Sequence, residues 1–298
     1  MSTRHPGSVQ AATTLAAALP LALFTAGLAI AADGTSLEFE YTRGILATAD
    51  FGDARLGGTE NRLAIRGASR PAGAGAFRWA LDYAYQRYEY TGLASRNRDL
   101  HRLELPLTWQ GDTALSWMVE FRPVVATSSN VFKDLWSRGG ADDRMWHGRV
   151  LAGRAPGGPG WGWHLGAARD DAFGREAVYP VAALLRQHRG VNMEIGWPVT
   201  RAMLDVGRGF ELGGEVAPAG AKWHVVSDER DGASFDYEVR AWRAGAILHW
   251  RSAGGLMLTT RAGLEFERRH RLEDDTGAFV NRAVEDAAFL EVAASYRW

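Results

Sequence analysis

The stretch EVAASYRW, residues 291–298, ends the chain on a tryptophan and indicates what kind of fold to expect. Successive side chains of a β-strand point to opposite faces. Polar residues occupy one face of this stretch, and apolar residues occupy every second position on the other, beginning slightly upstream: Ala288, Leu290, Val292, Ala294, Tyr296 and Trp298. The pattern therefore predicts a strand whose two faces meet different surroundings, with an aromatic side chain at its end.

The same alternation recurs along the chain. It is clearest in SLEFEYT, FRWALDYAYQ, HRLELPLTWQ, LSWMVEFR and LMLTTRAGLEFE. No helical periodicity competes over comparable lengths, and segments of about 9–15 residues can cross a bilayer when tilted. In FDYEVRAWRAGAILHW the alternation changes register near Trp242–Arg243, as a β-bulge would cause.

Two kinds of connection separate these segments. Short turns (RPAGAG, QGDT, APGGPG, RSAGG) alternate with longer polar connections at 46–60, 91–98, 127–143 and 270–283. Short turns at one rim and long loops at the other are typical of outer-membrane barrels, although a soluble periplasmic β-sandwich also alternates. Tryptophans near strand ends favour the barrel, because they suit two interfacial girdles. They are Trp109, Trp161, Trp163, Trp223, Trp250 and Trp298.

We therefore predict an all-β fold in which residues 32–298 form one closed antiparallel transmembrane β-barrel of the bacterial outer membrane. The expected number of strands is about 12, or about 14 if 190–206 is one strand interrupted near Pro198. Residues 1–31 are predicted to be a cleaved signal peptide, because Arg4 precedes an uncharged apolar stretch that ends in Ala29-Ile30-Ala31. The alternative is an uncleaved membrane anchor.

Composition narrows the function classes. A net charge of −1 gives no reason to expect a nucleic-acid partner. The chain has no cysteine, which excludes disulfides, thiolate catalysis and lipoprotein acylation. Of the 34 basic residues only Lys133 and Lys222 are lysines, so nearly every cation is a guanidinium that can bind two carboxylate oxygens at once.

Several stretches resemble known proteins. The ending AASYRW resembles the C-terminal signature of bacterial outer-membrane proteins, which implies recognition by the barrel-assembly machinery through Leu290, Val292, Tyr296 and Trp298. FRWALDYAYQRYEY, the Arg-Pro pair of EFRPVVATSSN, RDDAFGREAVYPVAALLR, EIGWPVTRAMLDV and the last strand resemble a family of uncharacterised outer-membrane β-barrel proteins, a domain of unknown function. Nothing about catalysis or a ligand follows from that resemblance.

The charged residues opposite the apolar face are the main candidates for function, because they would line the lumen. They are Glu38, Glu40, Arg62, Arg66, Arg78, Asp82, Arg102, Glu104, Glu120, Arg122, Arg240, Arg261, Glu265 and Glu267. Charges at this density must be hydrated or paired. A water-filled pore would make the protein a passive, porin-like channel, our first hypothesis. Arginine–carboxylate ladders that hold the barrel shut would leave a closed structural or surface-binding barrel, our second.

Evidence for enzymatic chemistry is weaker. No His-X-Ser sequence is present, so we predict no catalytic residues, and a lipid-modifying enzyme ranks third. We expect no cofactor and no metal site, although the paired acids Asp142-Asp143, Asp170-Asp171 and Asp274-Asp275 could bind cations that bridge lipopolysaccharide phosphates. The expected partners are outer-membrane lipid and lipopolysaccharide.

One connection has local order. In SSNVFKDLWSRGGADD, Asn130 followed by an apolar cluster and Asp134 predicts a helical turn. The turn would lie on the outer rim or, as an alternative, fold into the mouth of the barrel.

Overall fold

The computed structural model describes residues 36–68, 75–93, 95, 97–112, 115–156 and 160–298. The predicted signal peptide, residues 1–31, lies outside this part of the chain. Among the described residues, no helix has the length and apolar character needed to cross a membrane.

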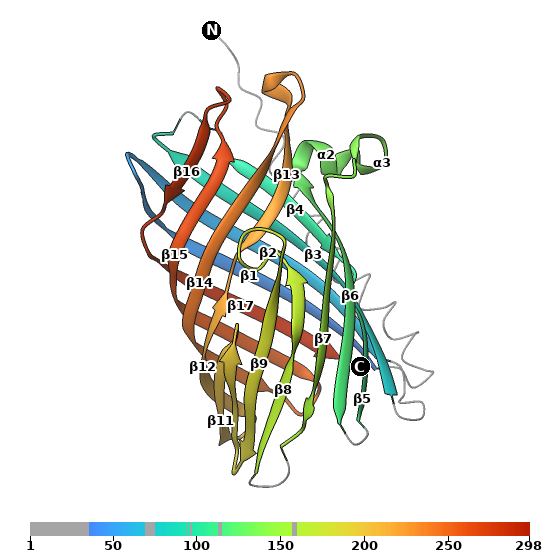
Figure 1. Cartoon of the computed structure of the whole chain (residues 1–298). Helices are drawn as coiled ribbons and strands as arrows, with labels where there is room; N and C mark the ends of the chain where they lie inside the picture. The colour runs from blue at the N-terminus through green and yellow to red at the C-terminus, as the bar shows by residue number, and fades with distance from the viewer. Residues whose placement is uncertain (1–35, 69–74, 94, 96, 113–114, 157–159) are drawn as a thin grey trace.

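The described chain is almost entirely β-structure (Figure 1). Seventeen segments form one sheet in which nearly all neighbours are antiparallel. The segments are β1 (Ser36–Phe51), β2 (Ala54–Ala68), β3 (Gly75–Thr91), β4 (Arg98–Glu104), β5 (Leu107–Asp112), β6 (Ser116–Ser128), β7 (Arg144–Arg154), β8 (Trp161–Asp170), β9 (Ala177–His188), β10 (Val191–Trp197), β11 (Thr200–Gly207), β12 (Phe210–Pro218), β13 (Ala221–Ser227), β14 (Ala233–Arg251), β15 (Leu256–Glu273), β16 (Phe279–Ala283) and β17 (Ala287–Arg297).

The sheet closes into a barrel of fourteen strands. The seventeen segments make fourteen strands because, at three places in the wall, two consecutive segments together form one strand. β4 and β5 both lie between β3 and β6, β12 and β13 both pair with β14, and β16 and β17 both pair with β15. The seam is formed by β1 and β17, where Glu38 faces Arg297 and Leu46 faces Phe289. The last strand therefore closes against the first, as the alternation at the chain end predicts.

The strand count agrees with the higher of the two predicted values, but for another reason. Residues 190–206 are not one interrupted strand: β10 and β11 form a hairpin that turns at Pro198-Val199. Two predicted long connections are also mostly strand. Within 46–60, β1 and β2 continue to a two-residue turn at Gly52-Asp53, and within 270–283, β15 and β16 pair.

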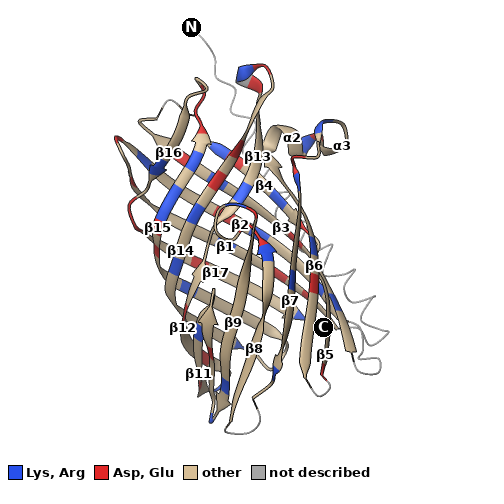
Figure 2. Cartoon of the chain, in the orientation of Figure 1, with Lys and Arg blue, Asp and Glu red and all other residues tan. Residues whose placement is uncertain are grey.

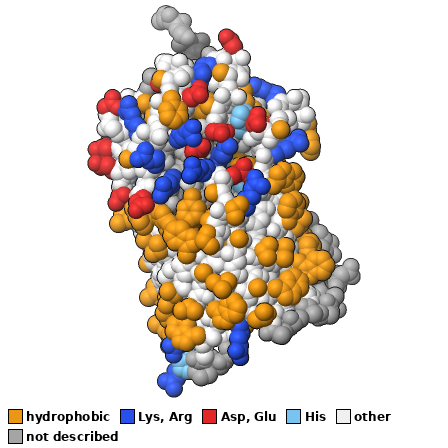
Figure 3. Space-filling view, viewed as in Figure 1, with side chains coloured by type: hydrophobic (Ala, Val, Ile, Leu, Met, Phe, Trp, Pro, Cys, Tyr) orange, Lys and Arg blue, Asp and Glu red, His pale blue; other side chains and the backbone are white. Residues whose placement is uncertain are grey.

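An apolar belt lies on the lower part of the barrel, and Figure 3 shows it on one face. Its members alternate with inward-facing residues and include Leu81, Val119, Leu165, Leu258 and Val292, all exposed. Trp109, Trp161 and Trp163 are also exposed, as expected for an interfacial girdle. Trp223 is not part of it, because it is 5% exposed and packs inside the barrel.

Strand β14 shows that the barrel reverses its polarity along its length. In its upper part, away from the start of β1 and the end of β17, Phe235, Tyr237 and Val239 face inward and are buried, while Asp236 is exposed. In its lower part Arg243 faces the lumen. The inward parity of β14 does not change. The two parts meet different media: water surrounds a dry core above, and lipid surrounds a charged lumen below.

The dry core is one continuous cluster that fills the upper end of the barrel. We call this the external end, because the start of β1 and the end of β17 lie at the opposite end, which is periplasmic in outer-membrane barrels. The ring of Tyr88 stacks on that of Tyr237 with centroids 5.5 Å apart, and the Tyr237 hydroxyl contacts the Tyr90 hydroxyl and lies 2.9 Å from Nδ1 of His270. Its members come from almost every strand that reaches this level, and include Phe51, Leu56, Leu100, Val124, Val225, Leu272 and Val280.

A bulge separates the two parts on β15. The register of β14 against β15 shifts between Arg240 and Trp242. The sequence predicts a bulge within β14 near Trp242–Arg243, but β14 keeps its parity and the bulge is on the partner strand. The extra residue lies on β15, where Glu267 adopts a left-handed backbone conformation with φ of 50°. Below the bulge the odd-numbered residues of β15 face inward, and beyond the bulge the odd-numbered residues face outward.

The barrel is narrower at its external end. Strands β8 to β12 end below the level of β13 and β16 (Figure 1). Above them β13 meets β6 directly, with His224 opposite Thr127 in a parallel bridge. The wall therefore has a step where β8 to β12 end, and the 171–176 connection packs against β13 there. The amide of Gly220 donates to the Ala172 carbonyl (2.8 Å), and the amide of Lys222 donates to Asp171 (2.8 Å).

The predicted helical turn is present as two short helices, α2 (Ser129–Lys133) and α3 (Leu135–Arg138). Ser128, not Asn130, is the N-cap residue of α2. Val131 is buried, the Asn130 amide donates to the Val226 carbonyl (2.7 Å), and Trp136 is fully exposed. The helices lie on the outer rim, which is the favoured of the two predicted positions (Figure 1).

The external core should contribute strongly to stability. We expect Leu100→Ala to lower the free energy of unfolding by about 2–5 kcal/mol, because Leu100 is completely buried and the cavity would stay partly unfilled. The control is Leu165→Ala on the lipid-facing side, where lipid chains fill the space. Urea unfolding in lipid vesicles, followed by tryptophan fluorescence, should show the smaller loss for the control. Equal losses would contradict a packed core.

Candidate functional site

A cavity of about 430 Å³ lies inside the barrel below the external core. Tyr88, Trp223 and Phe289 from the core form part of its boundary. Its polar lining comes from strands on all sides of the barrel: Glu60, Arg62, Arg66, Asp82, Arg102, Glu104, Arg122, Asp170, Asp171, Glu215, Arg243, Arg261 and Glu291. Figure 2 shows basic and acidic positions interspersed along these strands.

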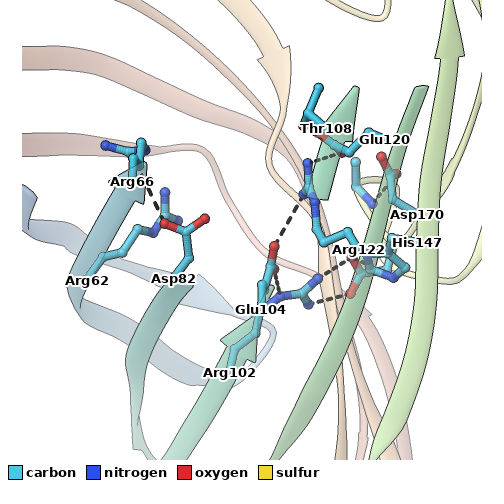
Figure 4. A network of polar contacts seen from close by, with 12 residues as sticks. Arg62, Arg66, Asp82, Arg102, Glu104, Thr108, Glu120, Arg122, His147 and Asp170 are labelled. Atoms are coloured by element: carbon cyan, nitrogen blue, oxygen red, sulfur yellow. Dashed lines mark hydrogen bonds and ion pairs between the residues drawn. The ribbon is translucent and has the colours of Figure 1, made fainter. Parts of the chain in front are cut away.

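Arg102 is at the centre of the charge network in this cavity (Figure 4). Its guanidinium donates to both carboxylate oxygens of Asp171, at 2.6 and 2.9 Å, and also contacts Glu104. Glu104 accepts from Arg122 (3.3 Å), which donates to Glu120 (2.6 Å). Bidentate arginine–carboxylate pairs are strong and directional, so this chain connects β4, β6 and the 171–176 connection into one unit.

Further pairs line the rest of the wall. Arg66 donates to Glu40 (3.2 Å) and Glu38 (3.4 Å). On the opposite side Glu265 accepts from Arg243 (2.8 Å) and from Arg268 (3.0 Å), and Arg261 contacts Glu291. Because most of these charges have an opposite charge beside them, the lining is a lattice of pairs and carries little unbalanced charge.

The structure brings most of the predicted lumen residues together. Glu38, Glu40, Arg62, Arg66, Asp82, Arg102, Glu104, Glu120, Arg122, Arg261 and Glu265 belong to the pairs or to the cavity lining. Arg78 lies on the same face of β3 as Asp82 and is exposed. Arg240 and Glu267 differ from the prediction: both line a groove on the outer surface. Arg240 lies in the upper part of β14, where polar residues face outward, and the bulge turns Glu267 outward.

The sequence did not predict Asp171 as part of the lumen, because it lies in the connection between β8 and β9 and not in an alternating segment. In each of the three acid pairs at least one carboxylate makes a structural contact. Asp171 binds Arg102, Asp143 accepts from the Gly140 amide (2.7 Å), and Asp275 accepts from Arg98 (2.8 Å). Asp274 accepts hydrogen bonds from the Thr276 hydroxyl and from backbone amides of its turn, and these lower its pKa. Among the described residues, no group of three His, Asp or Glu side chains is suited to hold a metal ion.

A second polar cluster lies on the outside of the barrel, near the external rim. The Ser129 hydroxyl is 2.7 Å from Nε2 of His101, and Nδ1 of the same ring is 2.8 Å from the Tyr83 hydroxyl. The ring of Phe132 stacks on His101 with centroids 4.5 Å apart. A search for His-X-Ser could not find this pair, because the two residues are 28 positions apart and only the β4–β6 register brings them together.

A closed antiparallel barrel with an apolar outer belt and a charged interior is the architecture of outer-membrane proteins. The chain has this architecture, and the start of β1 and the end of β17 lie together at the end of the barrel that is periplasmic in that class. Of the four predicted recognition residues, Leu290, Val292 and Tyr296 lie in β17 and Trp298 follows its last residue; Leu290 and Val292 face outward.

Solved outer-membrane barrels are similar to this fold. The translocator domain of the autotransporter NalP from Neisseria meningitidis matches with 11% identity over 95% of this chain and 98% of that chain, at a TM-score of 0.38. An outer membrane channel from Pseudomonas putida F1 matches with 9% identity over 89% and 95%, at 0.45. LpxR from Salmonella typhimurium matches with 11% identity over 88% and 99%, at 0.38. No protein-family model and no curated protein sequence matches the chain.

Breaking the charge network at its centre should destabilise the barrel. We expect Arg102→Gln to lower the free energy of unfolding by about 3–5 kcal/mol, because Glu104 and the buried Asp171 would lose their shared partner. The control is Arg78→Gln, a lumen arginine at an exposed position, with an expected change within about 0.5 kcal/mol. Thermal unfolding, followed by the heat-modifiable band in electrophoresis, measures both. Equal stability of the two variants would show that the network is not structural.

Proposed function

We propose that this protein is a closed outer-membrane barrel that acts at its outer surface and does not conduct solutes. Of the two leading hypotheses from the sequence, the closed barrel has the better support. The observation that carries the proposal is the apolar core at the external end, in which side chains such as Leu56, Leu100 and Tyr237 are completely buried. A passive channel needs a hydrated path through that level, and a packed core provides none.

The charge lattice below the core supports the same proposal. Solute selection by a charged lining requires charges that face water and attract the solute. Here Arg102, Arg122 and Arg243 each bind carboxylates of the barrel itself. The lattice therefore supports the second role considered for these residues, in which they hold the wall together.

Planar-bilayer recording tests the closed state directly. We expect purified, heat-modifiable protein to give no discrete conductance steps, because the external core blocks the lumen. A variant with Tyr88→Ala and Trp223→Ala removes two large side chains above the cavity and should give steps. Trp109→Ala, on the lipid-facing side, is the matched control and should stay silent. Salt-dependent steps from the unaltered protein would overturn the proposal in favour of a channel.

Ester hydrolysis at the outer rim is a second candidate function, and the Ser129–His101 pair is the observation that favours it. A serine hydroxyl beside a histidine nitrogen, with a third group at the other ring nitrogen, is the arrangement that activates a serine nucleophile. The pair lies on the outside of the barrel, where acyl esters of membrane lipids are the nearest substrates. Tyr83 takes the orienting position that a carboxylate occupies in many hydrolases.

Covalent labelling with a fluorophosphonate separates this candidate from a structural role. The unaltered protein should be labelled, and both Ser129→Ala and His101→Asn should lose the label, because one removes the nucleophile and the other its base. Ser137→Ala, at an exposed serine of α3, is the control and should leave labelling unchanged. Failure of the unaltered protein to react would exclude an activated serine at this site.

A further inference from the structure

A groove with space of about 1050 Å³ lies on the outer surface where the barrel wall steps down. Four arginines line it: Arg175 from the 171–176 connection, Arg240 from β14, and Arg269 and Arg271 from β15. We call the groove that these four residues line the arginine groove. In Figure 3 basic side chains gather on this face directly above the apolar belt. In outer-membrane barrels the rim of the apolar band lies at the level of the lipid headgroups.

The bulge on β15 creates the arginine groove. Because of the register shift at Glu267, Arg269 lies directly opposite Arg240 on the outward face of the β14–β15 pair. Without the extra residue, Arg269 would lie on the same face of β15 as Glu265 and would point into the barrel. Two like charges opposite each other in an antiparallel pair are destabilising. The fold therefore holds an unfavourable arrangement that a bound anion would relieve.

The groove carries an excess of positive charge. Glu238 and Glu267 also line it, so four guanidiniums face two carboxylates. Arg271 binds Glu238 (3.1 Å), and Arg269 donates only to the neutral side chain of Asn281 (3.2 Å). Within the described part of the chain, neither Arg175 nor Arg240 has a carboxylate at ion-pair distance.

Aromatic side chains form the other half of the lining. Phe173 stacks on Trp197, with ring centroids 5.6 Å apart, and the ring centroids of Trp197 and Trp242 are 5.3 Å apart. They come from three separate elements, and Trp197 is 47% exposed. Guanidiniums adjoining an exposed aromatic surface match a ligand that has phosphate at one end and hydrocarbon at the other.

We infer that the arginine groove binds a phosphate group of a phosphorylated glycolipid in the outer leaflet, with its acyl chains against Trp197 and Trp242. This inference rests on the proposal that the protein acts at its outer surface. Arginine suits the role because its planar fork can donate two hydrogen bonds to a phosphate. Arg240 and Arg269 bind the phosphate between them, and Arg175 closes the site from the 171–176 connection.

The test is titration of the full-length barrel in detergent micelles with diphosphoryl lipid A, followed by tryptophan fluorescence. We expect the double variant Arg240→Gln, Arg269→Gln to bind at least about tenfold more weakly, because the two phosphate donors are lost. Its thermal stability without lipid should be equal or higher, because the like-charge pair is removed. A double variant with Arg55→Gln and Arg144→Gln, at exposed arginines elsewhere near the external end, is the charge-matched control and should bind normally.

Two further ligands identify what the groove recognises. Dephosphorylated lipid A should bind as weakly to the unaltered protein as diphosphoryl lipid A binds to the groove variant. Inorganic phosphate at the same concentration should not displace the lipid. Equal binding of the dephosphorylated lipid, full displacement by phosphate, or normal binding by the groove variant would each overturn the inference. Bilayer recording is independent of this titration: a silent barrel that fails to bind lipid A refutes only the groove, whereas a conducting barrel that binds it refutes only the closed state.

Discussion

The seam between β1 and β17 is the constraint on which the rest of the structure depends. Lipid offers no hydrogen bonds, so every backbone group at membrane depth must pair within the protein, and a sheet can satisfy this only by closing. Closure pairs β1 with β17 from Glu38 opposite Arg297 to Leu46 opposite Phe289. It also creates an interior, and the residues that alternate with the lipid-facing ones must then either pair with one another or stay in water.

The interior uses two different solutions at two depths. At membrane depth the wall turns its apolar residues outward, and its charges form a lattice in which Arg102 and Glu265 each bind two partners. Above the membrane the outside is water, so the same strands turn apolar side chains inward around Tyr237 and close the mouth. This reversal of the apolar face requires no change of fold, because successive side chains of a β-strand point to opposite faces and either face can contact water or lipid.

The step in the wall is where these two parts meet, and it concentrates the unusual features of the molecule. Strands β8 to β12 stop short, the 171–176 connection fills the gap from inside through Asp171, and the β15 bulge reverses the facing of the residues beyond it. Phe173, Trp197 and Trp242 become neighbours only because the wall is lowered there. A surface with both aromatic and guanidinium character therefore arises at the headgroup level.

Alternation alone determined the architecture: a closed antiparallel barrel with a lipid-facing apolar belt and charged residues such as Arg102 and Glu104 inside. These features are local, since the two-residue period of a strand assigns each side chain to a face. The sequence did not determine which medium each face meets at a given depth, so Trp223 was expected in the girdle and Arg240 in the lumen. Nor could it bring Ser129 to His101, Arg240 to Arg269 or Asp171 to Arg102. Those contacts depend on strand register and on where the wall steps down, and only the closed tertiary structure decides both.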